Sequence, residues 1–415
     1  MDTYLVGGAV RDEMLGHPFH ERDWVVVGSS PKEMTENGFK SVGKDFPVFL
    51  HPETQEEYAL ARTERKTSGG YTGFSFHAAP DVTLEEDLIR RDLTINAIAK
   101  DADGNIIDPY HGQTDIENRI LRHVSNSFCE DPVRILRTAR FAARYHHLGF
   151  SIAGETHALM KTMVDNGEVD YLVPERVWKE MSRALAEKNP DVFFEVLKVC
   201  GALARLMPEI NNLFGIPQRP EHHPEIDCGI HSLMVLQQAT LLSQKSEVRF
   251  ASLVHDLGKA TTPADVLPQH IGHEHRSIDL VKQLCERLAV PNEFRNLGLM
   301  AAQYHTHCHR AKELTPKKIL ETLNALDAFR RPDRFADFLL CCEADAKGRT
   351  GFEDRDYPQA EYFQNALDIC EKITAAQVDR SKHQGKAIGE EIHRLRISAL
   401  KAYKQENLLT QTKKK

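Results

Sequence analysis

The chain has 415 residues, of which 41% are hydrophobic and 27% charged, values typical of a soluble globular protein with two to four domains. Its formal net charge of −8 excludes a generally basic nucleic-acid binder, so any nucleic-acid contact would need a local basic surface. The eight cysteines show no C-x-x-C spacing, which excludes a zinc ribbon and favours reduced thiols. With no apolar leader after Met1 and no run of membrane-spanning length, the sequence predicts a cytoplasmic protein that does not enter a membrane.

Strand signals are concentrated in residues 1–125, and helical spacing of apolar residues dominates from about 126 onward. The expected strands are Tyr4–Val6, Trp24–Val27, Val48–Leu50 and Tyr58–Ala61, followed by a segment of mixed character, Asp92–Ala99. This pattern predicts an α+β protein: a small α/β head with a mixed sheet, followed by an all-helical remainder. We expect four parts, with bounds 1–125, 126–227, 228–350 and 351–415.

The stretch 5–28 is predicted to form a strand, a turn at Gly7-Gly8, a short helix and a second strand. Backbone N–H groups at a turn that opens a helix can hold phosphate, and Arg11 lies one turn further on, where its guanidinium can meet the same group. The alternative is a simple turn in which glycine supplies a positive φ.

Two carboxylates, Glu21 and Asp23, precede the second strand with i, i+2 spacing and therefore point the same way. Together they could hold Mg²⁺ beside a triphosphate, and Glu57 or Glu56 could supply a third carboxylate. Surface acids at this place could also be merely solvated.

The run Arg90-Arg91-Asp92 lies before the apolar segment 93–99. Arg91 could bind a phosphate, while Asp92 or Asn96 fixes the local backbone or a sugar. The alternative is a solvated cluster of charges.

Residues 130–144 are expected to form a helix with Asp131 as N-cap and Pro132 at its first position. One arc of this helix carries only arginines, and the opposite arc is apolar. The arginines are Arg134, Arg137, Arg140 and Arg144. Because no acid follows Asp131 on the arginine face, these charges are expected to be uncompensated and to bind an anion, either triphosphate or RNA backbone.

Asp131 and Arg134 could also read a base. A carboxylate that accepts and a guanidinium that donates match the Watson–Crick edges of cytosine and adenine, which pair an exocyclic amine with a ring-nitrogen acceptor. Guanine and uracil present the opposite pattern, so this pair would select C and A.

At these motifs the chain resembles the bacterial class II tRNA nucleotidyltransferases, the CCA-adding enzymes, in their multifunctional gamma-proteobacterial form. The resemblance rests on LVGGAVRD, ERDW, RRDLTINA and EDPVRILRTARFAAR, in this order and spacing, and covers the whole chain. It implies that C, C and A are added to the 3′ end of tRNA from CTP and ATP with Mg²⁺. It also implies that nucleotide contacts come from Gly8, Arg11, Arg91, Arg137 and Arg140. Metal binding is implied for Glu21 and Asp23, the catalytic pair. Base selection is implied for Asp131 and Arg134. The family commonly has Asp where this chain has Glu21.

A second motif lies in residues 247–259, an apolar helical segment that carries His255-Asp256. Alone, this dipeptide could be a capping pair. With His231 before it and Asp345 after it, the order resembles the ligand set of HD-type phosphohydrolases. The resemblance implies Ni²⁺ or another divalent metal and 2′,3′-cyclic phosphodiesterase, 2′-nucleotidase and phosphatase activities. Six further histidines either line this site or face solvent: His270, His273, His275, His305, His307 and His309.

The last segment includes a helix expected over 390–400 that in the family contacts the tRNA body, although a solvated helix would look the same. Expected partners are therefore tRNA, CTP and ATP, with monomer and dimer both open. Three alternatives differ in class: a poly(A) polymerase, an HD phosphohydrolase with a regulatory nucleotide-binding head, and a tRNA-binding chaperone. The acid pair argues against a binding module, since carboxylates without metal repel a triphosphate.

Overall fold

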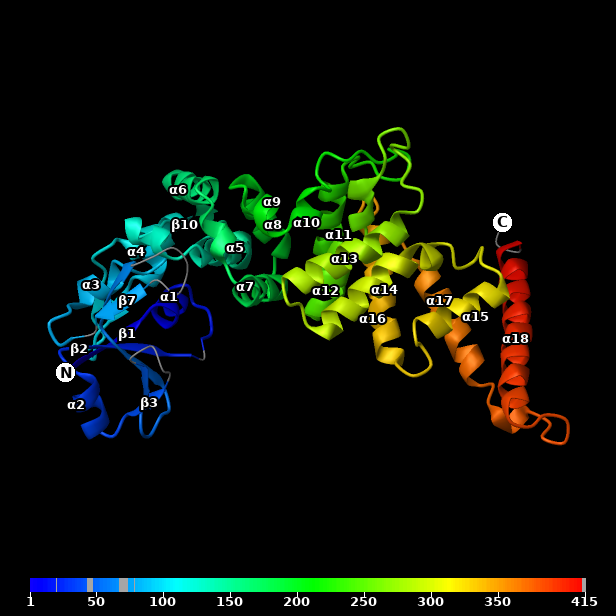
Figure 1. The fold of residues 1–415 in the computed structure, drawn as a ribbon, viewed down its shortest axis with the longest axis horizontal. Coiled ribbons are helices and arrows are strands. Elements are labelled where there is room, and N and C mark those ends of the chain that lie inside the picture. Colours follow the sequence, from blue (N-terminus) through cyan, green and yellow to red (C-terminus); the bar gives the residue numbers. More distant parts are fainter. Residues whose placement is uncertain (20, 43–47, 67–73, 78, 413–415) are drawn as a thin grey trace. The chain divides into compact units, whose positions relative to one another are not determined.

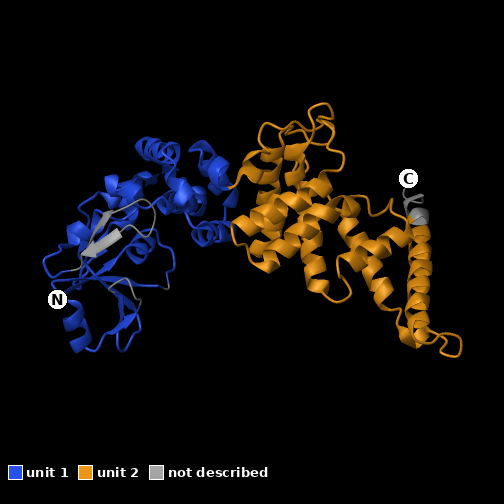
Figure 2. Ribbon diagram, viewed as in Figure 1, with its two compact units in different colours: residues 1–206 blue, residues 207–415 orange. Residues whose placement is uncertain are grey.

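The computed structural model describes residues 1–19, 21–42, 48–66, 74–77 and 79–412 (Figure 1). The chain divides into two compact units, residues 1–206 and 207–415 (Figure 2). The predicted segment 126–227 extends across the junction between these units, and the four-part division stays a prediction. Among the described residues, no helix combines the length and apolar character needed to cross a bilayer.

Unit 1 contains a mixed seven-stranded sheet with the order β3-β4-β5-β2-β1-β8-β9. Only β2 and β5 run parallel, and the other neighbours in this sheet are antiparallel. The bounds are β1 (Asp2–Val6), β2 (Asp23–Val27), β3 (Lys40–Val42), β4 (Val48–Leu50), β5 (Glu57–Leu60), β8 (Ala99–Lys100) and β9 (Ile106–Ile107). The four predicted strand runs are confirmed, with edges that differ by at most two residues.

Two further strand pairs lie outside this sheet: β6 (Thr63–Lys66) with β7 (Phe74–His77), and β10 (Ile120–Leu121) with β11 (Ser151–Ile152). The segment expected to be mixed contains a 3-10 turn, η1 (Thr94–Asn96), before β8 begins. Strand signals therefore end close to residue 125, as predicted, apart from the two residues of β11.

The helices of unit 1 cover the sheet and then continue as a helical extension. They are α1 (Gly8–Met14), α2 (Pro31–Glu36), α3 (Leu84–Leu88), α4 (Gly112–Asn118), α5 (Val133–Tyr145), α6 (Gly154–Asp165), α7 (Pro174–Ala186), α8 (Pro190–Val199) and α9 (Ala202–Leu206). Short 3-10 turns η2 (Asn126–Glu130), η3 (His146–Leu148) and η4 (Glu168–Tyr171) connect some of them. Helix α5 packs on α7 and α8 through its apolar side, where Ile135, Leu136 and Ala139 are fully buried.

The regular secondary structure of unit 2 is all helical in its described residues, apart from an isolated bridge between Pro217 and Asp227; loops connect the helices. Its elements are α10 (Pro208–Asn211), α11 (Cys228–Leu242), α12 (Ser246–Val254), η5 (Leu257–Thr261), α13 (His273–Arg287), α14 (Asn292–His309), α15 (Pro316–Ala325), α16 (Pro332–Lys347), α17 (Pro358–Glu371), η6 (Ala375–Gln377) and α18 (Lys386–Thr412). The α+β class, with a mixed-sheet head and an all-helical remainder, is confirmed.

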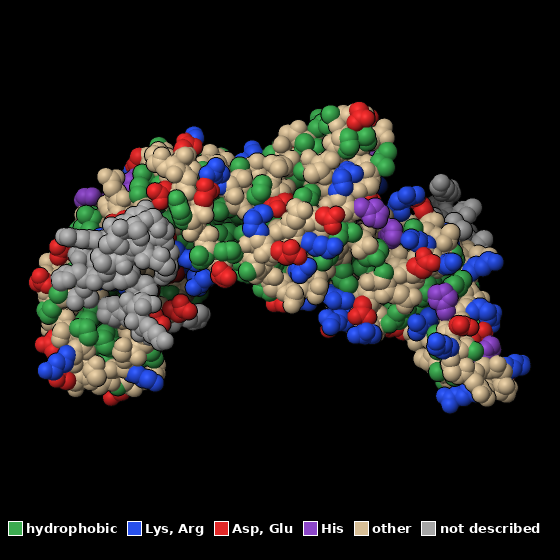
Figure 3. Space-filling view, in the orientation of Figure 1, with side chains coloured by type: hydrophobic (Ala, Val, Ile, Leu, Met, Phe, Trp, Pro, Cys, Tyr) green, Lys and Arg blue, Asp and Glu red, His purple; other side chains and the backbone are tan. Residues whose placement is uncertain are grey.

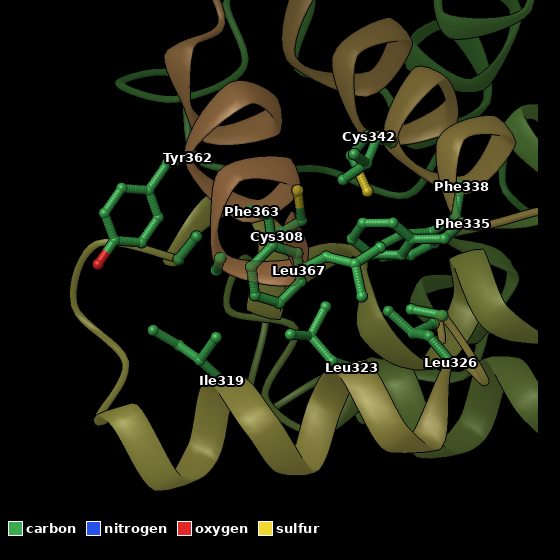
Figure 4. Close-up of a cluster of buried hydrophobic side chains, with 14 of the residues drawn as sticks. Cys308, Ile319, Leu323, Leu326, Phe335, Phe338, Cys342, Tyr362, Phe363 and Leu367 are labelled. Carbon is green, nitrogen blue, oxygen red and sulfur yellow. The ribbon is translucent and has the colours of Figure 1, made fainter. Parts of the chain in front are cut away.

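One core of unit 2 lies between α14, α15, α16 and α17 and is rich in phenylalanine (Figure 4). The Phe335 ring lies 5.8 Å from that of Phe363, centroid to centroid, and both side chains are fully buried. Cys308 and Cys342 are buried in the same core, one helical turn from His305 and Asp345, respectively. The core therefore fixes the two helices that carry these polar side chains.

Candidate active sites

A cavity of about 910 Å³ lies in unit 1, between the sheet and helices α5 and α7. It brings together every residue that the sequence predicts for the nucleotide site, which are Gly8, Arg11, Glu21, Asp23, Arg91, Asp131, Arg134, Arg137 and Arg140. These residues come from β2, α1, α5 and the turn after α3, so the chain must fold before they meet.

Strand register brings the glycine turn beside the acids. In the antiparallel pair β1–β2, Val6 lies opposite Asp23, and Gly7 follows directly. Gly7 has a φ of +69°, and a Cβ at this position would lie 2.9 Å from Arg91 Nη1. The backbone conformation therefore favours glycine here, and a Cβ would also displace the end of the Arg91 side chain.

Glu21 and Asp23 both line the cavity, and their side chains are exposed to it. Desolvation by the surrounding walls raises the pKa of Asp23; the charge of Arg91 opposes this rise, and the charge of Glu21 adds to it. Two carboxylates that line the same cavity suit a divalent cation, since bound positive charge compensates both.

The structure separates the two candidates for a third carboxylate. Glu57 lies opposite Asp23 in the parallel pair β2–β5, so both side chains point to the same face of the sheet. Glu56 accepts a hydrogen bond from Trp24 Nε1 at 3.0 Å. Trp24 stacks on Tyr58 and belongs to the opposite face from Asp23. The geometry thus favours Glu57 over Glu56.

Arg11 is only 4% exposed and is held from several sides. Its guanidinium donates to both oxygens of Asp12, at 2.9 and 3.0 Å, and to Asn96 Oδ1. It also lies 5.0 Å from the centre of the Phe141 ring, within cation–π distance. Arg11 therefore joins α1 to α5 and to η1, and it enters the cavity in a fixed orientation.

The expectation that the arginines of α5 are uncompensated is wrong. Arg137 Nε donates to Asp92 Oδ2 at 2.8 Å, and Arg140 Nε donates to Glu180 Oε2 of α7 at 2.7 Å. The compensating acids come from other elements, so inspection of i±4 positions within the helix does not find them. Arg144 likewise lies 3.2 Å from Asp12.

The cavity nevertheless keeps an excess of positive charge. Its lining includes eleven arginine and lysine side chains and six carboxylates, an imbalance that favours an anionic ligand. Burial alone would raise the pKa of Asp92, but the charge of Arg137 and a hydrogen bond from Asn96 hold that pKa well below its usual range. Asp92 thus stays ionised and orients Arg137.

Asp131 and Arg134 lie on the same wall of the cavity, each with protein partners. Asp131 Oδ1 accepts from Val133 N at 3.1 Å, but α5 begins one residue later than expected, so Pro132 and not Asp131 is its N-cap residue. Arg176 of α7 binds both carboxylate oxygens of Asp131, at 3.0 and 2.6 Å. Arg134 donates to the Ser127 carbonyl at 2.9 Å. Sequence reasoning missed Arg176, since nothing in its local sequence links it to Asp131.

A second cluster of polar residues lies in unit 2 and contains the four residues of the predicted metal set. His231 Nε2 is 3.1 Å from Asp345 Oδ1, and His255 Nε2 is 3.1 Å from Asp256 Oδ2. The two pairs meet, because His255 Nε2 is 3.7 Å from Asp345 Oδ1. All four side chains are buried.

The local structure explains how the imidazoles are oriented. His231 follows the N-terminus of α11, which Asp227 caps by accepting from the N–H groups of Gly229 and Ile230. His231 Nδ1 donates to Gly348 O at 3.0 Å, and His255 Nδ1 donates to Ser252 O at 2.7 Å. Both rings therefore direct their Nε2 toward the carboxylates.

The donor set fits a metal ion. His255 Nε2 and Asp256 Oδ1 are buried and make no hydrogen bond of acceptable geometry. Groups of three ligand atoms within 4.8 Å of one another include His231, His255 and Asp256. Two imidazoles with two carboxylates would suit a divalent transition metal, whose positive charge would compensate the two buried acids.

The sequence left the placement of six histidines undecided, and two of them belong to this cluster. His273 Nε2 and His305 Nε2 lie 3.1 and 3.4 Å from Asp256 Oδ1. A third, His309, contacts Asp345 Oδ2 at 2.5 Å and accepts from the Tyr357 hydroxyl at 2.8 Å. The spacing of His305 and His309 on one helix was the available signal, since residues four apart share a face.

The other three histidines lie apart from the cluster. His270 contacts Pro217 O and Thr262, His307 contacts Thr322, and His275 is exposed. Sequence reasoning also missed Lys259, whose Nζ lies 2.5 Å from Asp256 Oδ2. Burial alone would raise the pKa of Asp256, but the charges of His255 and Lys259 hold it well below its usual range.

The C-terminal helix α18 carries the basic residues Arg394, Arg396, Lys401 and Lys404, and Figure 3 shows lysine and arginine side chains over this part of the surface. Arg394 pairs with Glu391, and Arg396 donates to Cys370 O at 3.0 Å. A tRNA contact at this helix stays a prediction.

Three family models match separate parts of the chain. Residues 3–122 match the poly A polymerase head domain, and residues 149–214 match the probable RNA and SrmB-binding site of polymerase A. Residues 229–330 match the HD domain. The first match contains the glycine turn and the acid pair, and the third contains His231, His255 and Asp256.

Known structures share the fold over nearly the whole chain. The apo form II of a CCA-adding enzyme has a TM-score of 0.67 at 19% identity, covering 99% of this chain and 92% of that one. A CCA-adding enzyme in complex with ATP has a TM-score of 0.65 at 17% identity, with 99% and 90% covered. The Thermotoga maritima CCA-adding enzyme complexed with tRNA-CCA has a TM-score of 0.62 at 19% identity, with 99% and 91% covered.

Two curated relatives are much more similar in sequence. The multifunctional CCA protein of Teredinibacter turnerae is 63% identical over 404 residues, covering 97% of this chain and 98% of the relative. That of Thioalkalivibrio sulfidiphilus is also 63% identical, over 406 residues, with 98% and 99% covered. With this identity over almost its full length, the chain belongs to the family of multifunctional CCA proteins and is a nucleotidyltransferase.

Proposed function

We propose that this enzyme adds and repairs the 3′-terminal CCA of tRNA, using CTP and ATP with Mg²⁺ and no nucleic-acid template. The observation that carries this proposal is the convergence of all nine predicted residues on one positively charged cavity. The relatives' name and the ATP and tRNA complexes of the structural neighbours support the same substrates. The free thiols of all eight cysteines fit a cytoplasmic location.

The residues around the cavity have separable roles in this proposal. Glu21 and Asp23 hold Mg²⁺, which would supply the positive charge that neutralises the triphosphate and favours ionisation of the attacking tRNA hydroxyl. The backbone of Gly8 and the guanidinium of Arg91 bind phosphate oxygens. Arg11, Arg137 and Arg140 bind and position the same anion, held by Asp12, Asp92 and Glu180, respectively.

Base selection is assigned to Asp131 and Arg134, because both line the cavity, Asp131 just before α5 and Arg134 on its first turn. Their present partners, Arg176 and the Ser127 carbonyl, hold them in place without blocking every donor and acceptor. Each carboxylate oxygen has a second lone pair, and Arg134 has further N–H groups. A cytosine or adenine edge can therefore be read by a prearranged pair.

The test uses tRNA that lacks its 3′ end, incubated with each nucleotide alone and with CTP and ATP together. We expect two additions with CTP alone, and C, C and A followed by a stop with both nucleotides. GTP and UTP should not be incorporated. Repeated addition from ATP alone would instead identify a poly(A) polymerase and refute the proposal.

We further propose that unit 2 is a metal-dependent phosphohydrolase with 2′,3′-cyclic phosphodiesterase, 2′-nucleotidase and phosphatase activities. The buried, hydrogen-bond-free Nε2 of His255 carries this proposal. His231, His255, Asp256 and Asp345 would hold Ni²⁺ or another divalent transition metal, which would supply an activated water. The match to the HD domain supports the assignment.

This second activity is tested with the full chain after removal of metal by a chelator. Adenosine 2′,3′-cyclic phosphate, adenosine 2′-phosphate and p-nitrophenyl phosphate are offered with Ni²⁺, Mn²⁺, Mg²⁺ or no metal. We expect hydrolysis to return with a transition metal and to be absent from a His255→Ala variant treated identically. Equal hydrolysis by that variant would show that another site, or a contaminant, is responsible.

A further inference from the structure

A second cavity, of about 370 Å³, lies in unit 2 beside the histidine-rich cluster. Lys259 and His273 line it, and both contact Asp256 of the cluster, so the cavity and the cluster share a wall. The rest of its described lining consists of Gln218, Arg219, His222, His223 and residues 268–271. Its volume is at the small end of ligand sites, which fits the end of a nucleotide chain and excludes a folded nucleic acid.

The charges of this cavity favour an anion. Its described lining includes Arg219, Lys259, His273 and three further histidines, and it includes no carboxylate. The guanidinium and the ammonium supply positive charge to this cavity.

Gln218 is the polar residue of this lining that the structure leaves incompletely satisfied. Its side chain is 2% exposed, and its Oε1 accepts from Lys259 Nζ at 2.7 Å. Its Nε2 is buried and has no hydrogen-bond partner. Because an ammonium can only donate, the oxygen of the amide must face Lys259, and this fixes Nε2 on the other side.

The backbone around Gln218 makes this arrangement rigid. Gln218 N donates to Ile226 O at 2.6 Å, beside the bridge between Pro217 and Asp227. Asp227 in turn caps α11, the helix that carries His231. The amide of Gln218 is thus tied to the same framework as the predicted metal ligands. A buried donor without a partner costs stability, which is a reason to expect a ligand that accepts from it.

We propose that Gln218 positions the substrate of the second site by donating its Nε2 hydrogens to a phosphoryl oxygen. Lys259 links this amide to Asp256, so a phosphoryl group beside the metal ligands lies within reach of both residues. The substrate class is a phosphorylated nucleotide terminus whose anionic group enters the cavity. This inference rests on the proposed phosphohydrolase function and names the residue that would bind its substrate.

The test compares three variants of the full-length protein. Gln218→Leu removes the amide, while Gln218→Glu keeps an oxygen for Lys259 and replaces the N–H donor with a second carboxylate oxygen, which adds a negative charge. Gln269→Leu makes the same chemical change at an exposed glutamine that lines the same cavity. Each protein is assayed for hydrolysis of adenosine 2′,3′-cyclic phosphate, for inhibition by inorganic phosphate, and for nickel bound per chain.

Both Gln218 variants should raise KM and weaken phosphate inhibition about tenfold or more, which is the effect of one lost hydrogen bond to a charged group. In Gln218→Glu the bound nickel and the nucleotidyl transfer activity should be unchanged. Gln269→Leu should stay within about twofold of the wild-type KM and inhibition, since exposed polar contacts contribute little. This pattern separates substrate binding from support of Lys259.

Three results would overturn the inference. One is an unchanged KM and phosphate inhibition in Gln218→Glu; another is an equal loss in Gln269→Leu. The third is a loss of nickel and kcat with KM preserved, which would make Gln218 structural. If the wild-type protein hydrolyses no phosphoester, the proposed function fails, and calorimetric binding of inorganic phosphate to the nickel-loaded proteins still decides the role of Gln218.

Discussion

Arg137 Nε donates to Asp92 Oδ2 across 2.8 Å, and this ion pair joins helix α5 to the turn that follows α3. Asp92 also accepts from Asn96 Nδ2 at 2.9 Å, and Asn96 accepts from Arg11. A continuous chain of polar contacts therefore runs from the arginine helix to the helix after the glycine turn. Several arginines that line the cavity of unit 1 are thus held by acids from other elements.

The Asp92→Asn variant should lose stability because it leaves the charge of Arg137 without its buried partner. A loss of about 3–5 kcal/mol in the free energy of unfolding is expected at pH 7. An Asp103→Asn variant, changed at an exposed turn, should differ from wild type by less than about 0.5 kcal/mol. Denaturant unfolding measures both, and similar values for the two variants would contradict the role assigned to Asp92.

The pH dependence of this loss has a defined sign. Because the folded-state pKa of Asp92 is lowered, the ionised carboxylate stabilises the fold fully above its unfolded value of about 3.9. This stabilisation is lost as the pH falls from the unfolded-state pKa toward the folded-state pKa of Asp92. The gap between wild type and Asp92→Asn should therefore be constant from pH 5 to 7 and narrow below about pH 4. A gap that narrows instead as pH rises toward 7 would reverse the argument.

The two active sites should be separable by single substitutions. Asp23→Ala is expected to abolish nucleotide incorporation, since it removes one of two adjacent carboxylates, and to leave phosphodiesterase activity intact. His255→Ala should do the reverse. Incorporation assays with truncated tRNA and hydrolysis assays with a cyclic nucleotide provide the two measurements. Loss of both activities in either variant would refute the two-site arrangement.

The nine residues predicted for the nucleotide site do line one cavity of unit 1, and strand register in the head accounts for the meeting of the glycine turn with the acid pair. The pairing of Val6 with Asp23 is an example. Partners from distant elements were not predictable in this way. Glu180 lies 40 residues after Arg140, and Arg176 lies 45 after Asp131. Neither position carries a local signal in the sequence. Because Glu180 could not be linked to Arg140, the arginine face was wrongly expected to lack counter-charges.

The histidine cluster shows the same limit. The order of His231, His255-Asp256 and Asp345 indicated a shared site, whereas the neighbouring histidines gave no basis for choosing among them. Only the packing of α14 on α12, and of α13 on α14 and η5, decides that His273 and His305 approach Asp256. Helical spacing fixes the face of a residue on its own helix, and tertiary packing decides what that face meets.

Arg134→Ala should impair the choice between bases more than it weakens tRNA binding. The side chain lies on the first turn of α5, and its loss removes one donor from the predicted C/A-reading pair. Misincorporation of UTP and GTP relative to CTP should rise about tenfold or more, given about 1–3 kcal/mol for one base contact. Competition assays between nucleotides measure this ratio. Unchanged discrimination against UTP would remove Arg134 from base selection.

Arg176→Leu tests whether base selection depends on the orientation of Asp131. The substitution removes the two hydrogen bonds, at 3.0 and 2.6 Å, that hold the carboxylate. Fidelity should fall in the same direction as in Arg134→Ala, while the affinity for tRNA stays near wild type. Lys179→Leu, on the same helix and the same cavity, is the control and should keep wild-type fidelity.

Metal should stabilise unit 2. Chelator-treated protein is expected to unfold at a lower temperature, since buried Asp256 and Asp345 would then rely on histidine, lysine and arginine neighbours alone. Added Ni²⁺ at about 100 times its dissociation constant should return about 2.7 kcal/mol. Thermal unfolding of wild type and His255→Ala with and without Ni²⁺ checks this. An equal shift in both proteins would place the metal elsewhere.

Gly258 should tolerate no side chain, because η5 passes close to the start of α13. A Cβ at this position would lie 2.1 Å from His273 O and 2.5 Å from Ser277 N, both backbone atoms that cannot yield separately from the helix. Gly258→Ala is therefore expected to destabilise the protein by about 3 kcal/mol and to move His273 away from Asp256. Gly389→Ala in α18, where nothing lies within 4 Å, should instead stabilise it by about 0.4–1 kcal/mol. Denaturant unfolding and the bound-nickel content are measured for both variants. A Gly258→Ala protein with wild-type stability and full nickel content would show that the close approach of η5 to α13 does not require glycine.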